Sequence, residues 1–178
     1  MKVICVLGVT CSGKTTYIKN LLETEYKDKK RPVTLHHGKF FRETLGPETF
    51  SGLSEPDAPE MTERWVRNMI THASEIAYFN DRDLIIDGFP RTVVQVDWLL
   101  LSSMVSIRSL PVEFRFIWPD EEILKERINK RIESDPDGLA LLSRRIEIDA
   151  TMVCKVFDFI KDQYSKKYEK LTIMEIEQ

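Results

Sequence analysis

The sequence predicts an α/β fold in which a parallel sheet is flanked by helices. Two short runs, residues 3–7 (VICVL) and 84–86 (LII), are apolar throughout and are followed by Gly8 and Asp87. Continuous apolar runs of this length are typical of strands that are buried on both faces, as in a parallel sheet. Helical patterns separate the apolar runs, and strands that alternate with helices along a chain indicate the α/β class.

The remaining elements continue this alternation in chain order. The spacing of apolar residues predicts weaker strands over residues 112–118 and 171–176, and helices over about residues 14–24, 62–79, 92–101, 119–132 and 146–168. Thr62 provides a cap-like start for the second helix. Two stretches interrupt the pattern. Residues 45–60 contain three prolines and two glycines, which predicts a loop or a small inserted segment, and residues 133–138 (ESDPDG) predict a short flap.

Length and composition favour a single domain. The chain has 178 residues, of which 42% are hydrophobic, so one compact domain over residues 1–178 can bury a full core. Its net charge of −3 gives no broad attraction to nucleic acid or to an anionic membrane. The three cysteines lack the spacing of a metal site, and neither a leader nor an apolar run of membrane-spanning length is visible. We therefore expect a cytoplasmic protein that binds neither nucleic acid nor membranes.

The clearest motif is GVTCSGKT, which directly follows the first apolar run. A GxxxxGK(S/T) pattern between a strand and a helix turns backbone N–H groups inward as an anion nest, and the helix start adds positive potential. Lys14 is then placed for the outer phosphates of a nucleotide, and the Thr15 hydroxyl is placed for Mg²⁺. The alternative is a turn of small residues that merely packs. The candidate donor-binding residues are Gly8, Val9, Thr10, Cys11, Ser12, Gly13, Lys14, Thr15 and Thr16.

A second candidate group begins where the apolar run 84–86 ends. Asp87 lies at the carboxyl edge of the predicted sheet, where open α/β sheets bind ligands, so it is a candidate second ligand for the metal. Its alternative role is that of a helix cap or turn former. After it, Gly88 and Pro90 shape a turn that directs Arg91, whose planar guanidinium suits two phosphate oxygens.

The string DGFPRT, residues 87–92, resembles the signature of the adenylate kinase and nucleoside monophosphate kinase family. The string follows GVTCSGKT at the separation that is usual in this family. The resemblance extends over nearly the whole chain. It implies a P-loop kinase fold with an acceptor-binding segment at about residues 37–80 and a short lid at about residues 132–140. It also implies a monomeric enzyme that transfers a phosphoryl group from ATP, with Mg²⁺, to a nucleoside monophosphate.

On the acceptor side, the resemblance implies that Arg91 and Arg42, the latter in HGKFFR, grip the acceptor phosphate. Gln95 lies one helical turn after Arg91, where its amide can pair with a base edge, and a glutamine at this place favours AMP. The alternatives are an exposed helix arginine at position 42 and a solvent-facing glutamine at position 95. Met61 is either an apolar wall for the base or a core methionine. The candidate acceptor residues are His37, Gly38, Arg42, Met61, Gly88, Phe89, Arg91 and Gln95.

Later arginines complete the candidate catalytic set. ERINKR places Arg127 and Arg131 four residues apart on one helical face, and the alternative reading is a solvated basic face. The resemblance implies that these arginines stack on the donor base and contact the transferred phosphates, together with Arg145, which matches better than Arg144. Such cations suit phosphoryl transfer, which needs positioning and charge neutralisation. The candidate catalytic residues are Lys14, Arg91, Arg127, Arg131 and Arg145.

Several positions depart from the family pattern. Lys39 stands where an acidic residue is usual, His37 replaces a small hydroxyl residue, the flap lacks the lid arginine, and no closing helix follows LTIMEIEQ. We expect transfer from ATP to AMP, which yields two ADP. A kinase for UMP, CMP or a deoxynucleotide is the second hypothesis, and a nucleotide-binding regulator with little catalysis is the third. DGFPRT disfavours sugar or shikimate kinases, and the lack of a basic stripe disfavours a nucleic-acid motor.

Overall fold

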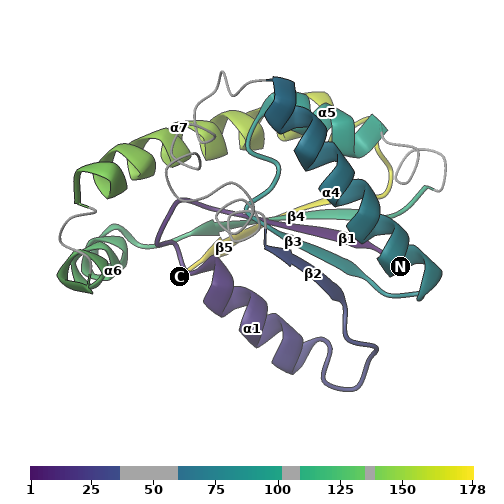
Figure 1. The fold of residues 1–178 in the computed structure, drawn as a ribbon, viewed down its shortest axis with the longest axis horizontal. Helices are drawn as coiled ribbons and strands as arrows, with labels where there is room; N and C mark the ends of the chain where they lie inside the picture. Colours follow the sequence, from purple (N-terminus) through teal and green to yellow (C-terminus); the bar gives the residue numbers. More distant parts are fainter. Residues whose placement is uncertain (37–59, 102–108, 135–138) are drawn as a thin grey trace.

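The fold is described from a computed structural model of the chain (Figure 1). It covers residues 1–36, 60–101, 109–134 and 139–178. Residues 45–59 of the loop predicted over residues 45–60, the first part of the acceptor-binding segment and residues 135–138 of the predicted flap lie outside these described residues. Glu60, the last residue of the predicted loop, already belongs to a helix.

Within the described residues, a five-stranded sheet forms the centre of the fold, and all of its strands are parallel. In sheet order the strands are β2 (Val33–His36), β3 (Leu84–Asp87), β1 (Val3–Leu7), β4 (Val112–Trp118) and β5 (Leu171–Glu177). The central strand β1 pairs with β3 on one side and with β4 on the other. The predicted α/β class with a parallel sheet is therefore confirmed, and the predicted strands have the observed bounds to within one residue.

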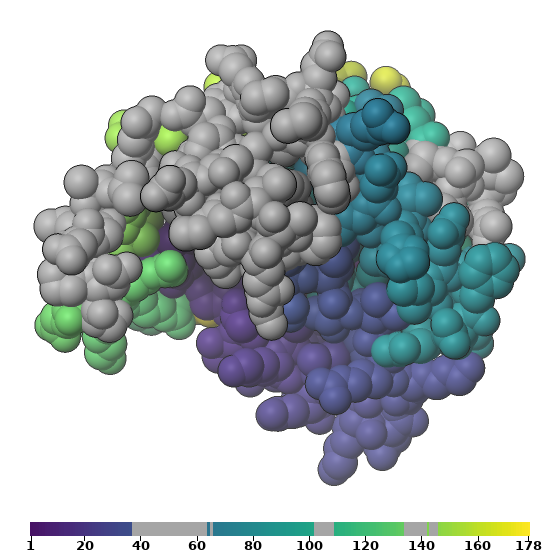
Figure 2. Space-filling model, in the orientation of Figure 1, coloured from purple at the N-terminus to yellow at the C-terminus, as the bar shows by residue number. Residues whose placement is uncertain are grey.

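Helices cover both faces of the sheet (Figure 1). They are α1 (Lys14–Thr24), α4 (Glu60–Phe79), α5 (Val93–Leu101), α6 (Glu121–Ser134) and α7 (Leu139–Gln163). In Figure 1, α4, α5 and α7 lie on one face, α1 lies on the other, and α6 lies beside the carboxyl ends of the strands. Figure 2 shows α6, in green, and α4, in blue, at opposite ends of one face of the molecule. No helix in the described ranges is both long and apolar enough to cross a membrane.

The two covered faces explain the continuous apolar runs. Successive residues of a strand point to opposite faces, so alternate residues of β1 enter different cores. One core contains Val3, Cys5 and Leu7 with the buried side chains of α4, α5 and α7. The other core contains Ile4 and Val6 with the buried side chains of α1. Both faces of β1 are buried, and none of its five residues is charged or strongly polar.

The sequence analysis does not predict β2, for a physical reason. Its four residues, VTLH, include only two aliphatic side chains, and all four are partly exposed. The strand lies at the edge of the sheet and is held by β3: the Val33 amide donates to the Asp83 carbonyl at 2.8 Å, and His36 pairs in register with Asp87. Pairing with a neighbour, rather than a local apolar pattern, therefore makes this strand.

The start of α6 differs from the predicted one because of a cap. The helix begins at Glu121 and not at Pro119. The Asp120 carboxylate accepts a hydrogen bond from the Glu122 amide at 2.8 Å, which satisfies one of the free N–H groups of the first turn. Asp120 is thus the residue before the helix, and the proline precedes the cap.

The bounds of α7 also differ from the prediction, which places a helix over residues 146–168. The helix begins at Leu139, so SRRI lies within its first two turns and not at its start, and the buried Leu142 extends its apolar face. It ends at Gln163. Just beyond this end, the Tyr164 hydroxyl donates to the Asp97 carboxylate of α5 at 2.5 Å, which anchors the segment to α5.

A buried arginine joins β4 to α1. Arg115 is 3% exposed, and its guanidinium donates to Glu113 at 2.6 Å, to Glu25 at 2.9 Å and to the Tyr17 hydroxyl at 2.9 Å. Lys2 also pairs with Glu113. Burial by itself raises the pKa of Glu113, but the hydrogen bonds from Lys2 and Arg115 outweigh this effect and hold the pKa below its ordinary value of 4.5. The network therefore stabilises the fold with Glu113 ionised.

Glu113→Gln should lower the free energy of unfolding by about 1.5–3 kcal/mol at neutral pH, the usual range for a hydrogen bond to a charged group. Because the folded-state pKa is depressed, the contribution of the carboxylate is present above the unfolded-state value and is lost as the pH falls through the folded-state value. Urea unfolding at about pH 7 and about pH 3 should therefore give a large difference between the two proteins at the higher pH and a small one at the lower pH.

The matched control is Glu121→Gln, which removes an exposed carboxylate that pairs with Lys125 on the surface of α6. Its free energy of unfolding should change by less than about 0.5 kcal/mol at either pH. Equal losses for Glu113→Gln at both pH values would contradict the predicted role of its charge.

Candidate active site

The loop that follows β1, residues 8–13, passes so close to β4 that its first residue must be glycine. We refer to these residues as the glycine loop. A Cβ atom at Gly8, whose φ is +153°, would lie 2.8 Å from the backbone carbonyl oxygen of Ile117 and 2.6 Å from the Ser12 Oγ. A backbone oxygen in a paired strand cannot move aside, so any larger residue forces the loop away from β4.

The second half of the glycine loop has a conformation that aims backbone groups into the site. Cys11 and Gly13 have positive φ angles of 67° and 94°, and Gly13 is the residue before α1. Alternation of left-handed and ordinary conformations at a helix start produces a concave row of N–H groups, which is the structural basis of an anion nest. The positive φ angles of Cys11 and Gly13 are compatible with the predicted phosphate loop, and the phosphate role itself stays a prediction.

The ammonium group of Lys14 lies against the glycine loop. Its Nζ donates to the carbonyl oxygens of Gly8 and Val9, each at 2.7 Å. These two neutral acceptors belong to the first residues of the glycine loop, where Lys14 is predicted to bind phosphate. Thr15 and Thr16 are exposed on the first turn of α1, whereas Val9 and Ser12 of the loop are buried.

Helix α6 brings its two predicted arginines to the same loop. Arg127 donates from Nη1 to the Ser12 carbonyl oxygen at 2.8 Å, and Arg131 approaches the Cys11 sulfur with its Nη1 at 4.0 Å. A Cβ atom at Gly13 would lie 2.8 Å from the Arg127 Nη1, so the guanidinium lies directly over the start of α1. The predicted spacing therefore does place both arginines at the glycine loop.

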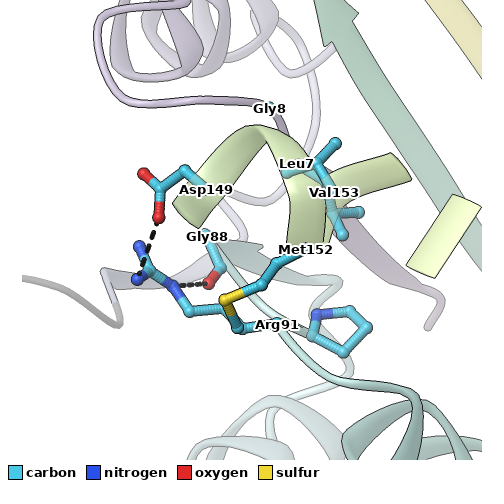
Figure 3. Close-up of a pocket in the computed structure, with 8 residues that line it drawn as sticks. Leu7, Gly8, Gly88, Arg91, Asp149, Met152 and Val153 are labelled. Atoms are coloured by element: carbon cyan, nitrogen blue, oxygen red, sulfur yellow. Dashed lines mark hydrogen bonds and ion pairs between the residues drawn. The ribbon is translucent and has the colours of Figure 1, made fainter. Parts of the chain in front are cut away.

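The turn after β3 holds Arg91 by its backbone. Gly88 has a φ of +75°, and its amide donates to the Val6 carbonyl oxygen at 2.9 Å, which ties the turn to β1. The Arg91 Nε donates to the Gly88 carbonyl oxygen at 3.2 Å (Figure 3). Phe89, a candidate acceptor residue, is fully buried in the core and supports the turn from within. The turn thus fixes Arg91 at the carboxyl edge of the sheet.

Gln95 is part of the cap of α5. Its side-chain Oε1 accepts a hydrogen bond from the Arg91 backbone N–H at 2.7 Å, and the Gln95 backbone N–H donates to the Thr92 Oγ1 at 3.2 Å. These reciprocal bonds resemble a capping box. The side chain is therefore one turn from Arg91, as predicted, and it has a structural task that does not depend on any base.

Two residues at this edge were missed by the sequence analysis, and the first is His36. It ends β2 opposite Asp87, and its Nδ1 lies 3.1 Å from the Asp87 Oδ2. The histidine predicted to bind the acceptor is its neighbour His37, which lies outside the described residues. Without the prediction of β2, nothing in the sequence indicated that residue 36 pairs in register with Asp87.

The second missed residue is Asp149, which connects two parts of the candidate site. It lies on α7 and is 5% exposed. Its Oδ2 accepts hydrogen bonds from the Thr10 amide, at 3.1 Å, and from the Thr10 hydroxyl. Its Oδ1 lies 3.5 Å from the Arg91 Nη1 (Figure 3). A signal existed in the sequence, because Asp149 interrupts the apolar stripe of α7 that continues through Met152 and Val156.

Among the residues that the structure describes, two cavities adjoin Arg91. A small one of about 20 Å³ lies between the glycine loop, the turn after β3 and α7, with Asp149 in its wall (Figure 3). A larger one of about 460 Å³ lies between the start of α5 and α7, lined by residues that include Val94, Thr151 and Lys155. The larger cavity falls in the size range of small-molecule sites. Arg91 therefore borders space that a ligand could occupy.

The remaining candidates cannot be placed. His37, Gly38 and Arg42 lie outside the described residues, as does Lys39. Met61 and Arg145 belong to α4 and α7, but the description of the structure does not extend to their side chains. Their assigned roles remain predictions.

Comparison with known proteins adds no relative. No protein-family model matches the chain, and no curated protein is significantly similar to it. The case for a function therefore depends on the motifs and on the geometry at the carboxyl edge of the sheet.

Gly8→Ala should destabilise the protein by about 2–4 kcal/mol, because the new methyl group clashes with a backbone oxygen and forces the loop to shift. Gly88→Ala is the matched control. Its φ is also positive, but the nearest atom to its added Cβ is 3.9 Å away, so only the backbone preference of about 1–2 kcal/mol is lost. Thermal unfolding of the two variants measures the difference, and equal losses would contradict the close approach of the loop to β4.

Proposed function

We propose that this protein is a nucleoside monophosphate kinase with a P-loop kinase fold, which transfers the terminal phosphoryl group of ATP to an acceptor monophosphate. One observation carries the proposal: cationic side chains from three separate segments meet at the glycine loop. Lys14 and Arg127 donate to its carbonyl groups, and Arg91 is joined to it through Asp149. A structural turn of small residues needs no such cations, whereas a pair of polyanionic substrates does.

The donor phosphates would lie in the glycine loop. Its N–H groups and the start of α1 favour negative charge at that place. Lys14 and Arg127 now donate to neutral carbonyl oxygens, which a phosphate oxygen can replace with a stronger, charge-assisted partner. Both side chains can therefore shift to the nucleotide without leaving a charge unpaired.

The acceptor phosphate would lie against Arg91. The guanidinium donates to the Gly88 carbonyl oxygen and faces Asp149, so its orientation is already restricted before any ligand arrives. A pre-set donor costs no reorganisation during the reaction, which is the main way that a protein accelerates transfer between two anions. Arg131 and Arg145 are proposed to neutralise the charge that develops on the transferred group.

The described residues fit Mg²⁺, a hard cation that prefers oxygen ligands and keeps several water molecules. The Thr15 hydroxyl is exposed on the first turn of α1, and Asp87 ends the strand next to β1. No group of three or more His, Cys, Asp or Glu side chains in the described ranges could hold a metal by itself, so phosphate oxygens and water would complete the coordination. Bound there, Mg²⁺ would neutralise charge on the nucleotide phosphates.

AMP is the proposed acceptor, and a pyrimidine monophosphate is the second candidate. The place of Gln95 one turn after Arg91 supports AMP. The cap that occupies the Gln95 Oε1 favours the second candidate, because one of the groups that would read an adenine edge is already in use. Incubation with ATP, Mg²⁺ and each of AMP, UMP, CMP and dAMP, followed by separation of the nucleotides, tests both.

Formation of ADP from ATP and AMP, with the highest kcat/KM for AMP, is the expected result. A preference for UMP or CMP would change the assigned acceptor but leave the assigned reaction, phosphoryl transfer from ATP, unchanged. No turnover with any acceptor would reject the proposal, and tight ATP binding in that case would favour a regulator.

Lys14→Ala and Arg91→Ala should each lower kcat/KM by about 10²- to 10³-fold, because each removes a preorganised donor to phosphate. Both variants should still fold, since neither side chain is part of the hydrophobic core. The melting temperature of Lys14→Ala should stay close to that of the wild-type protein, whereas that of Arg91→Ala should fall, because the buried Asp149 carboxylate loses its cation. Lys130→Ala is the control: its ammonium pairs with Glu126 on the exposed side of α6, away from the loop, so activity should be unchanged. A near wild-type rate for either active-site variant contradicts the assignment.

A further inference from the structure

We propose that Asp149 couples the donor and acceptor sites, so that a nucleotide in the glycine loop raises the affinity of Arg91 for the acceptor phosphate. This inference rests on the proposed function and assigns a positioning residue to it. The two oxygens of Asp149 are shared between Thr10, which lies in the donor loop, and Arg91, which lies in the acceptor turn.

The location of Asp149 is unusual for a residue without such a task. It is 5% exposed on the face of α7 that also buries Met152 and Val156. A buried carboxylate is costly unless it is paired and hydrogen-bonded, and an apolar residue would pack better in that stripe. The carboxylate is retained here with hydrogen bonds to one partner and an ion pair to another, which indicates that it serves to join them.

The two partners come from segments with different predicted ligands. Thr10 uses both its amide and its hydroxyl on the Asp149 Oδ2, so the position of the loop backbone and the orientation of the carboxylate are linked. Arg91 faces the other oxygen, Oδ1, at 3.5 Å. Because a carboxylate is planar and rigid, a rotation that follows Thr10 also moves the oxygen that faces Arg91.

The coupling should be positive, because donor binding would order the groups that then bind the acceptor. Thr10 belongs to the glycine loop, whose N–H groups a donor phosphate would contact. Phosphates in the nest would fix the loop, and with it Thr10, the carboxylate and the guanidinium of Arg91. An acceptor that then binds meets an ordered arginine and loses less entropy, so its affinity increases. Linkage requires that the acceptor raises the affinity of the donor by the same factor.

The coupling can be measured without any turnover. Calorimetric titration of AMP into the wild-type protein, alone and with saturating Mg²⁺ and the non-hydrolysable ATP analogue AMP-PNP, gives two dissociation constants. Their ratio should be about tenfold, within the usual range for coupled sites. In Asp149→Asn the amide nitrogen would face Arg91 or Thr10 in place of an acceptor, so the ratio should fall to nearly one.

Two further variants separate coupling from stability. Thr10→Val removes the hydroxyl that binds Asp149 and should also lower the ratio, whereas Thr10→Ser keeps that hydroxyl and should restore it. Asp158→Asn makes the same change at an exposed place on the same helix and should keep the wild-type ratio. Should Asp149→Asn fail to fold, as judged by its melting curve, the two Thr10 variants still decide the matter.

Each outcome has one meaning. A merely structural role for Asp149 would lower the melting temperature and leave the ratio unchanged, which overturns the proposal. A wild-type ratio of one also overturns it, although the proposed function would survive, since both nucleotides would still bind. A wild-type protein that binds neither nucleotide overturns the proposed function, and the coupling with it.

Discussion

The common direction of the described strands is the constraint on which the candidate site depends. In a parallel sheet every strand ends at the same edge, so the residues that follow β1, β2 and β3 meet there although they are far apart in the chain. Gly8, His36 and Asp87 are brought together in this way. The apolar runs that bury both faces of the sheet therefore also determine where the polar residues after each run must gather. The chemistry of the edge is a consequence of the packing of the core.

The partners of a cation separate structural arginines from those available to a ligand. Arg115 is buried and bonds to two carboxylates and a hydroxyl, so its charge is neutralised within the fold. Arg127 instead donates to a backbone carbonyl group, and Lys14 donates to two. A phosphate oxygen can replace a neutral carbonyl partner with a stronger, charge-assisted one, whereas a carboxylate already is such a partner. Arg91 lies between these cases, because it has both a carbonyl partner and a carboxylate partner.

The sequence was sufficient for those parts of the fold that depend on local patterns. The strands β1 and β4, the glycine loop and the facing arginines of α6 all follow from apolar spacing or a short motif. It failed where a distant partner decides: β2 exists because it pairs with β3, and α7 ends where Tyr164 bonds to α5. Gln95 shows a different limit. Its place one helical turn after Arg91 suits a base contact, and its place three residues after Thr92 suits a helix cap, so the pattern alone does not distinguish the two uses.

Asp149 extends the same reasoning to a residue that the pattern of α7 would assign to the core. Its desolvation costs several kcal/mol, and hydrogen bonds from Thr10 with the charge of Arg91 offset that cost only while all three groups stay together. A displacement of either Thr10 or Arg91 therefore leaves the buried Asp149 carboxylate without part of its compensation. Because one partner belongs to the loop after β1 and the other to the turn after β3, the penalty links two segments that the sheet only brings near each other. The core helix α7 thereby makes the geometry of one segment depend on that of the other.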